Sequence, residues 1–210
     1  MGIKEKFLHI WITNKTMGNI KYRFYKFLQK KYHFNQWHCT PINERRYAIK
    51  IVEYINSMNN VKSVFEIGCG LGEILNNIKA KKLKGYDIEK EVLRAARILN
   101  RKVNYSRGSF NKIRNEIITY LITVNFIHLL SPEQLKRYYE KIIQQNQVKY
   151  IVADEVNSPE YKYNHKMDKI LPKNFQCIKK IGPFEAFRGI RYIVIFENKD
   201  LNNTKHFKCY

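Results

Sequence analysis

The feature that most constrains the fold is a glycine-rich turn at Gly68–Gly72, placed between an apolar strand and a helical pattern. The run Val61–Ile67 before the turn is apolar enough for a buried strand, and a second strand, Leu83–Tyr86, ends on Asp87. Glycine permits backbone angles that other residues avoid, and it lets a ligand lie against the main chain. This order of elements predicts a strand-turn-helix-strand unit of the dinucleotide-fold type.

Two acidic residues narrow the choice of ligand. Asp87 lies 17 residues after Gly70, close to the spacing at which a carboxylate accepts hydrogen bonds from the hydroxyls of a ribose. The turn reads G-x-G-x-G and not G-x-G-x-x-G, and Glu66 stands two residues before its first glycine. A pyrophosphate is a poor neighbour for that carboxylate, whereas an ammonium or sulfonium group is a good one.

The run Val61–Arg97 resembles motifs I and II of the class I S-adenosylmethionine (SAM)-dependent methyltransferases. In that family E/D-x-G-x-G-x-G wraps the methionine end of SAM, and the acid after the second strand holds the ribose. The resemblance implies SAM as the cofactor, with S-adenosylhomocysteine (SAH) as its product. It also implies an α/β, Rossmann-like, doubly wound seven-stranded sheet, mostly parallel with an antiparallel last strand. An unliganded Rossmann-like turn and a nicotinamide site are the alternatives.

The resemblance covers about residues 60–200 and implies a set of cofactor-binding positions. The expected cofactor residues are Glu66, Gly68, Cys69, Gly70, Gly72, Asp87, Ile88, Ser109, Phe110 and Asn125. Many family members carry an acid for the adenine amino group where this chain has Ser109. A serine hydroxyl or a backbone carbonyl can accept the same hydrogen bond.

Sequence patterns outline the rest of the sheet. Further strands are predicted at Lys102–Tyr105, Ile117–Val124, Val148–Ala153, Phe175–Ile181 and Ile190–Phe196. The helix after the glycine turn is expected to include Ile74, Leu75 and Ile78, and a helix capped by Ser131 is expected to run to about Gln144. The last two strands are expected to be joined by a segment from Gly182-Pro183 to Arg188-Gly189.

The chain is divided by these patterns into an N-terminal helical extension (1–58), a SAM-binding domain (59–200) and a short tail (201–210). In the extension, Phe7–Thr13 is a short strand or helix, and Met17–Tyr32 is a helix with Ile20, Phe24, Phe27 and Leu28 on one face. A basic helix with an aromatic face can lie on a membrane surface. Packing of that face on the chain's own domain is the favoured interpretation.

Net charge is the most unusual global property. The 210 residues carry 39 basic and 18 acidic side chains, a formal charge of +21. Such a charge favours nucleic acid, an anionic membrane or a phosphorylated substrate as partner. A biased codon supply that enriches Lys, Asn, Ile and Tyr accounts for it equally well, and the basic residues are spread along the chain.

Cysteine spacing and hydropathy bear on the compartment. Cys39, Cys69, Cys177 and Cys209 show no paired or metal-binding spacing, which indicates free thiols in a reducing compartment. The sequence shows no signal peptide and no apolar run long enough to span a bilayer. A cytoplasmic location is therefore expected.

Candidate catalytic residues follow from where open α/β sheets bind ligands, at the carboxyl ends of their strands. Methyl transfer to an alcohol benefits from a general base with a pKa near 7, which points to histidine. His128, after the fourth strand, is the first candidate, with a core or helix-start histidine as the alternative. His38 and His165 are further candidates, and Asp154 either orients the base, contacts the acceptor or ends a strand in water.

Missing motifs disfavour several subclasses of the family. Asn125–His128 lacks the prolines typical of amino-methyltransferases of adenine and cytosine, and no Pro-Cys pair is present. Ribose 2′-O-methyltransferases carry an acid where Asn125 stands. Catechol-type enzymes cluster acids around a divalent metal, and only Asp154-Glu155 offers acids here. No metal site is therefore predicted.

These observations favour a metal-independent methyltransferase acting on a hydroxyl of a small molecule, a sugar or glycan precursor that is anionic or phosphorylated. The segments before motif I and after the fourth strand resemble methyltransferases of surface-polysaccharide pathways. An RNA methyltransferase, motivated by the +21 charge, and a non-catalytic SAM-fold binding protein are the alternatives.

Overall fold

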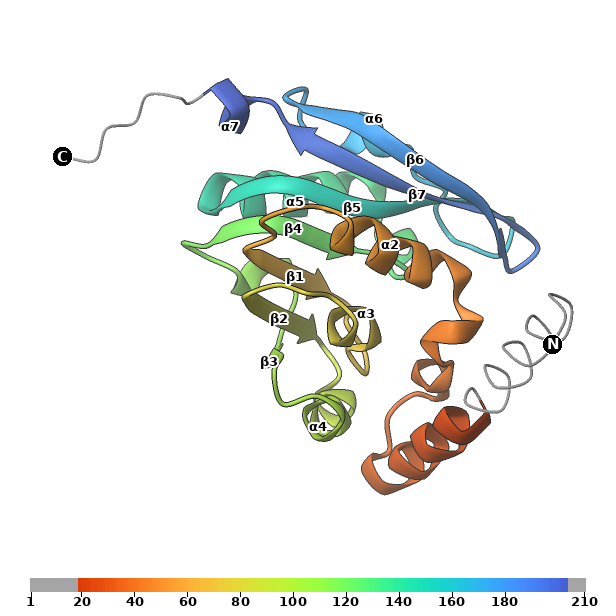
Figure 1. The fold of residues 1–210 in the computed structure, drawn as a ribbon. Helices are drawn as coiled ribbons and strands as arrows, with labels where there is room; N and C mark the ends of the chain where they lie inside the picture. The colour runs from red at the N-terminus through yellow and green to blue at the C-terminus, as the bar shows by residue number, and fades with distance from the viewer. Residues whose placement is uncertain (1–18, 204–210) are drawn as a thin grey trace, which may run out of the picture.

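A seven-stranded sheet in the order β3-β2-β1-β4-β5-β7-β6 forms the centre of the molecule (Figure 1). The computed structural model describes residues 19–203 of the chain. Strands β1 to β5 run parallel to one another, and β7 is antiparallel to both β5 and β6. The predicted doubly wound sheet, mostly parallel with an antiparallel last strand, is confirmed.

The elements alternate along the chain as a doubly wound fold requires. The strands are β1 (Ser63–Ile67), β2 (Lys82–Asp87), β3 (Asn104–Arg107), β4 (Ile117–Thr123), β5 (Gln147–Asn157), β6 (Phe175–Ala186) and β7 (Gly189–Asn198). The helices are α2 (Arg46–Asn56), α3 (Glu73–Asn76), α4 (Lys90–Leu99), α5 (Pro132–Gln145), α6 (Met167–Ile170) and α7 (Asp200–Asn203). Short 3-10 helices are η1 (Gln36–Cys39), η2 (Ile42–Glu44), η3 (Phe110–Lys112) and η4 (Ile127–Leu129).

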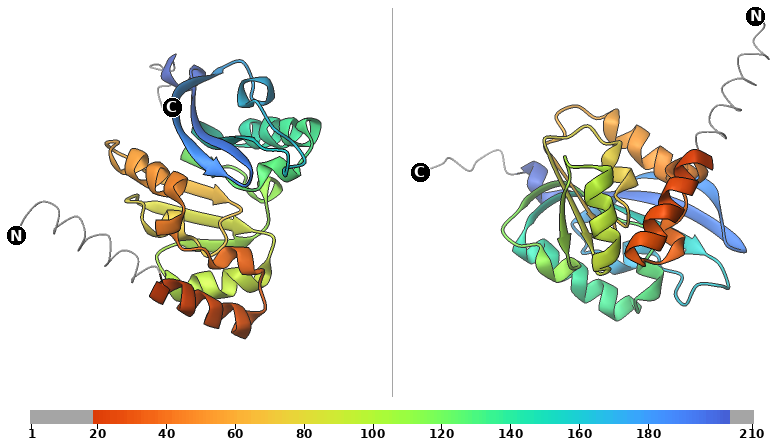
Figure 2. Two further views of the ribbon diagram at one scale, coloured as in Figure 1. Left: turned by 90° about the vertical axis from the view of Figure 1, so that its right-hand side faces the viewer. Right: turned by 90° about the horizontal axis from the view of Figure 1, so that it is seen from below.

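Helices cover both faces of the sheet, so its central strands are buried on two sides (Figure 2). All five residues of β1 are buried, and its successive side chains enter opposite cores. Val64 packs with α2, α3 and α4, whereas Phe65 packs with α5 and α6. Because β1 to β5 are parallel, their carboxyl ends lie at the same end of the sheet, together with the loops that follow them.

The start of α5 agrees with the sequence pattern. The Ser131 hydroxyl accepts a hydrogen bond from the Gln134 amide at 3.2 Å, and the Gln134 side chain accepts one from the Ser131 amide at 3.0 Å. This reciprocal capping box satisfies two amides that a helix start leaves unpaired.

Three predicted boundaries were wrong. Helix α3 ends at Asn76 and leaves Ile78 outside it, because the Asn77 side chain bonds the Glu73 carbonyl and stops the helix. Strand β3 begins two residues later than predicted, at Asn104. Gly182-Pro183 lies inside β6, at a shift of its register against β7, and not in a connecting loop.

Strand β5 is longer than predicted and takes Asp154 and Glu155 into the sheet. Both carboxylates are buried, with 2% and 8% of their surface exposed, so neither ends a strand in water. The register explains this, since Asp154 is paired with Ile193 of β7. The final antiparallel strand extends the sheet beyond the point where the apolar run in the sequence stops.

The helix of residues 19–32 buries only one of the four residues of the predicted face, Leu28, and packs mainly by another face. Tyr25 and Leu28 are buried, while Ile20, Phe24 and Phe27 are exposed. The segment Phe7–Thr13, Cys209 and most of the predicted tail lie outside the described residues, and the division at residues 58 and 200 remains a prediction. Within residues 19–203 no helix is long and apolar enough to cross a membrane.

Gly72 provides a test of how tightly the turn is built. Its φ is +74°, and a Cβ placed on it would lie 1.9 Å from the Tyr105 hydroxyl. Gly72→Ala should lower the free energy of unfolding by about 2–4 kcal/mol, from the left-handed backbone together with overpacking. Chemical denaturation measures this difference.

Asn60→Ala is the matched control, because Asn60 also has a positive φ of 59° but is exposed. It should lose only the backbone contribution, about 1–2 kcal/mol. Equal losses in the two variants would contradict the packed turn.

Candidate functional site

The glycine turn after β1 is the centre of the site. Gly68, Gly70 and Gly72 have φ values of +71°, +53° and +74°, a region that L side chains rarely adopt. The amides of Gly68 and Cys69 both donate to the Tyr86 carbonyl, at 2.7 and 3.0 Å. The turn is therefore fastened to the end of β2, and of its five residues only Gly68 is exposed.

Asp87 lies directly against this turn. Its Oδ2 accepts a hydrogen bond from the Gly70 amide at 2.9 Å, and its Oδ1 accepts one from the Glu89 amide at 3.0 Å. Each carboxylate oxygen can accept a second hydrogen bond. The carboxylate is thus held in one orientation and keeps acceptor capacity for two hydroxyl groups.

Glu66 is buried beneath the turn with 3% of its surface exposed. Its Oε2 atom has no hydrogen-bond partner among the described residues. Burial raises the pKa of Glu66 to about 8, although the nearby Arg45 guanidinium opposes the shift. A buried carboxyl oxygen without a partner is costly, and a cationic ligand group would satisfy it.

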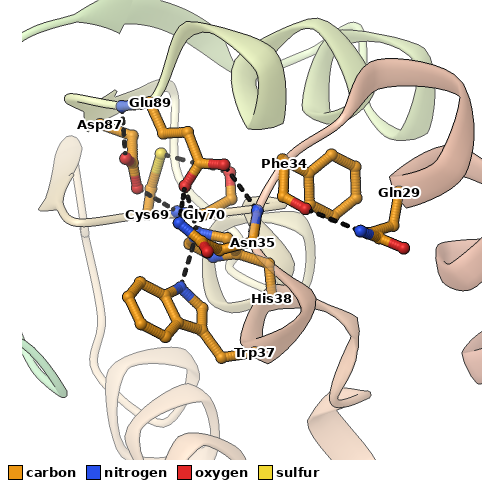
Figure 3. Close-up of polar contacts among 9 residues, drawn as sticks. All are labelled: Gln29, Phe34, Asn35, Trp37, His38, Cys69, Gly70, Asp87 and Glu89. Atoms are coloured by element: carbon orange, nitrogen blue, oxygen red, sulfur yellow. Dashed lines mark hydrogen bonds and ion pairs between the residues drawn. The ribbon is translucent and has the colours of Figure 1, made fainter.

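The segment before α2 lies against the turn, and Figure 3 shows its His38 beside Gly70. Glu89 accepts hydrogen bonds from the Asn35 amide at 2.6 Å and from the Asn35 side chain at 3.2 Å. The His38 ring lies against Gly70, so closely that a Cβ on that glycine would be 2.6 Å from Nδ1. The backbone of Gly70 is therefore enclosed between Asp87 and His38.

His38 has more neighbours than it can bond at once. Its Nε2 lies 2.9 Å from the Trp37 indole nitrogen and 3.2 Å from a Glu89 oxygen. Burial lowers the pKa of His38, against the opposing charges of Asp87 and Glu89. According to the tautomer, Nε2 either accepts a hydrogen bond from the Trp37 indole or donates one to Glu89, and in both cases the ring covers the turn.

A second ion pair fixes the helix that follows the turn. Glu73 is 4% exposed and accepts hydrogen bonds from the Arg45 guanidinium and the Tyr25 hydroxyl, both at 2.7 Å. Burial, then the charge of Glu73, raises the pKa of Tyr25, so that hydroxyl stays a donor. The N-terminal helix and the segment before α2 are thereby joined to α3.

An open groove of about 570 Å³ continues from the Asp87 end of the site. Its lining residues are Ile88, Arg107, Gly108, Ser109, Phe110, Asn111, Lys112 and Tyr138. Ile88 is 72% exposed, and the Phe110 and Tyr138 rings stack at 5.4 Å. Three predicted cofactor residues, Ile88, Ser109 and Phe110, thus line one groove beside Asp87.

A different cluster lies after β4. Asn125, at φ 69°, donates its amide to Asp154 at 3.0 Å, and its side-chain oxygen accepts from Arg191 at 2.9 Å. The Arg191 and Asp154 side chains are 4% and 0% exposed and lie 3.3 Å apart. Complete burial raises the pKa of Asp154, while the Arg191 charge opposes that shift.

His128 is linked to this cluster by the side chain of Tyr161, which contacts both His128 and Arg191. It is 7% exposed, its Nδ1 has no partner among the described residues, and its ring centroid lies 4.0 Å from that of Tyr161. Burial, then the charge of Arg191, lowers the pKa of His128 to about 4. The Tyr161 hydroxyl accepts a hydrogen bond from Arg191 at 3.3 Å.

The other candidate histidine has a structural position. His165 Nε2 lies 3.1 Å from both the Ile127 and the Leu130 carbonyls, so it ties the loop after β5 to the loop after β4. Its ring is 5% exposed. The geometry separates the three histidines, with His38 at the glycine turn, His128 near Arg191 and His165 between loops.

Four side chains of the site were not expected from the sequence: Glu73, Glu89, Tyr161 and Arg191. Glu89 follows Asp87 by two residues and could have been suspected from its place after β2. Arg191 and Tyr161 carry no local signal, because Arg191 reaches Asn125 and Tyr161 only through the folding of distant segments.

Cysteine and metal expectations can be compared with the described residues. Cys39, Cys69 and Cys177 are free thiols, with Cys69 buried in the turn, where burial raises its pKa. Among residues 19–203, no group of three or more His, Cys, Asp or Glu side chains is arranged to hold a metal ion.

Comparison with known proteins shows the fold. No protein-family model and no curated protein sequence matches the chain. Among solved structures, magnesium protoporphyrin IX methyltransferase from Synechocystis PCC 6803 with bound SAM has a TM-score of 0.61 at 10% identity, covering 88% of this chain and 96% of that one. The N-methyltransferase NodS from Bradyrhizobium japonicum with SAH has a TM-score of 0.66 at 12% identity, covering 83% and 97%.

A third structure, a small RNA methyltransferase, has a TM-score of 0.60 at 16% identity, and the match covers 74% of this chain and 25% of that one. These proteins act on unrelated acceptors, so their likeness to this chain concerns the sheet and its helices. The chain has the Rossmann-like fold of the SAM-dependent methyltransferases.

Proposed function

We propose that the protein is a SAM-dependent methyltransferase. The observation that carries the proposal is the turn at Gly68–Gly72, with Glu66 beneath it and Asp87 bonded to the Gly70 amide. Glu66 lies where the methionine part of SAM would be, and Asp87 lies where its ribose would be. The cofactor-binding solved structures of the same fold support the same conclusion.

The residues present fit SAM at each end. The unpartnered Oε2 of Glu66 suits the ammonium group of the methionine part, because the buried carboxyl group would gain an ion pair. Asp87 has acceptor capacity for the ribose hydroxyls. The groove beside it would take the adenine between Ile88 and Phe110, with Ser109 as a polar contact.

When bound, SAM supplies a methyl group on a sulfonium, which is already activated for transfer. The protein then has to position the acceptor in line and to take up its proton. We assign the positioning to the cluster of Asn125, Tyr161 and Arg191, and the proton to His128. Asp154 holds Arg191 and the Asn125 amide in place.

His128 with a pKa of about 4 is a weak base until an acceptor binds. Burial is the main cause of this low pKa and the Arg191 charge the second, so an anionic group on the acceptor near Arg191 would offset the second cause and make His128 a better base. This favours an anionic small molecule with a hydroxyl, such as a phosphorylated or nucleotide-linked sugar of a glycan pathway. The +21 charge of the chain supports the same choice.

We further propose that transfer needs no metal, because the assigned groups already provide positioning and a proton acceptor. RNA is the second candidate acceptor. It is favoured by the net charge and by the fold shared with a small RNA methyltransferase.

The acceptor assignment can be tested with labelled SAM, a panel of nucleotide sugars and an unstructured RNA. Wild-type protein should methylate one or more nucleotide sugars without added metal, and His128→Gln should reduce kcat by about 10²–10⁴ while leaving SAH affinity unchanged. His33→Asn, at an exposed histidine, is the control. Label found only in RNA would overturn the sugar assignment and retain the methyltransferase.

The ribose contact can be tested by a cycle of protein and ligand changes. Asp87→Ala should weaken SAH binding by at least about tenfold, because charged hydrogen bonds to hydroxyls are lost. Wild-type protein should bind 2′-deoxy-SAH more weakly than SAH, and Asp87→Ala should bind the two alike. If the variant still distinguished the two ligands in calorimetry, Asp87 would not be the ribose partner.

Proton release should accompany binding, because Glu66 has its pKa raised to about 8 and is mostly protonated at pH 7. The ammonium group of SAH favours the carboxylate, so binding expels a proton, and affinity should rise by up to about tenfold between pH 6 and pH 7. Calorimetry in buffers of different ionisation enthalpy counts the proton. Glu66→Gln should remove both effects, and an unchanged pH slope in that variant would refute the assignment.

A further inference from the structure

The helix of residues 19–32 has two apolar faces, and only one of them is packed. Tyr25 and Leu28 are 5% and 2% exposed and join the core. Ile20, Phe24 and Phe27 are 60%, 44% and 57% exposed. Because these three are spaced by four and then three residues, they form one continuous stripe along the helix.

Positive charge surrounds this stripe. The segment 19–32 carries five basic residues and no acidic one: Lys21, Arg23, Lys26, Lys30 and Lys31. Arg23, Lys30 and Lys31 are exposed. Long basic side chains beside exposed apolar groups are the arrangement of helices that lie in a lipid interface.

We propose that this helix seats the protein on an anionic lipid surface. The stripe of Ile20, Phe24 and Phe27 would enter the boundary between headgroups and acyl chains, and the neighbouring basic side chains would contact anionic headgroups. Both contributions add, since apolar burial and attraction to anionic lipid together set the strength of interfacial binding. The proposal concerns where the protein works and does not depend on its reaction.

A lipid surface fits the stripe better than single-stranded RNA does. RNA-binding rings offer open faces on which bases stack. Here the Phe24 and Phe27 rings stack on each other, with centroids 6.4 Å apart and planes 16° apart. The two paired rings and Ile20 form a ridge that a fluid lipid layer can accommodate without a matching shape. The basic residues beside the ridge complement the negative charge of the lipid headgroups.

The packed side of the helix connects this surface to the rest of the protein. The Tyr25 hydroxyl bonds Glu73 of α3 at 2.7 Å, and the Gln29 side chain donates to the Phe34 carbonyl at 3.1 Å. The helix (red in Figure 1) lies at the same end of the molecule as α3 and the carboxyl ends of the parallel strands. A protein seated through the stripe would therefore hold that end near the lipid.

The test is cosedimentation of the full chain with vesicles of neutral phosphatidylcholine, with and without 30% phosphatidylglycerol, a proportion chosen as about that of an anionic membrane. Wild-type protein should bind the anionic vesicles and bind neutral ones far more weakly. The double variant Phe24→Ser/Phe27→Ser should lose at least about tenfold in affinity. Lys30→Gln/Lys31→Gln should lose about fivefold for each lysine, on anionic vesicles only.

The matched control is Ile98→Ser/Ile117→Ser, which removes two side chains that are 52% and 69% exposed elsewhere on the surface. It should bind vesicles as wild type does, and all variants should keep the wild-type melting temperature. Three outcomes would overturn the proposal: no binding of wild type to anionic vesicles, equal losses in control and stripe variants, or a stripe variant that loses only RNA binding or self-association.

Discussion

The hydrogen bond from the Gly70 amide to Asp87, at 2.9 Å, is the interaction on which the site depends. It joins the turn after β1 to the end of β2, and it fixes one carboxylate against the main chain of Gly70. Only a residue without a Cβ serves at position 70, because the left-handed backbone and the His38 ring both exclude a side chain. Both the backbone conformation at position 70 and the packing of His38 against it therefore require glycine.

Burial of charge around this bond gives the site its electrostatic character. Glu66, Glu73 and Asp87 lie within a short stretch of the chain, and only Glu73 has a full ion pair, with Arg45. Burying a Glu66 oxygen without a partner costs free energy, and this cost falls when the carboxylate takes up a proton or binds a cation. The same principle applies at the other cluster, where burial and then the charge of Arg191 depress the pKa of His128, and an anion would offset the contribution of Arg191.

The sequence predicted the part of the site that is local in the chain. Glu66, the glycines and Asp87 follow from spacing, since a strand, a turn and a strand leave them few other positions. Arg191 could not be predicted, because its contact with Asn125 joins residues 66 positions apart across an antiparallel strand. Asp154 was expected at a strand end, and the pairing of β5 with β7 placed it inside the sheet.

The N-terminal helix shows why periodicity was insufficient there. Its apolar residues fall on two faces of the helix, and the face that the sequence pattern favoured is exposed in the structure except at Leu28. The hydrogen bond of Tyr25 with Glu73 decides between them, and it depends on where α3 lies. A buried polar contact of this kind is invisible to a count of apolar positions.

The most direct measurement of the central claim is the melting temperature of the wild-type protein with SAH and, separately, with NAD at equal concentration. A ligand that binds only the folded state raises the free energy of unfolding with the logarithm of the ligand excess over Kd, by about 2.7 kcal/mol at a hundredfold excess, and the midpoint rises with it. The glycine turn with Glu66 beneath it predicts a rise with SAH and none with NAD. A rise with NAD, or no rise with either, would contradict it.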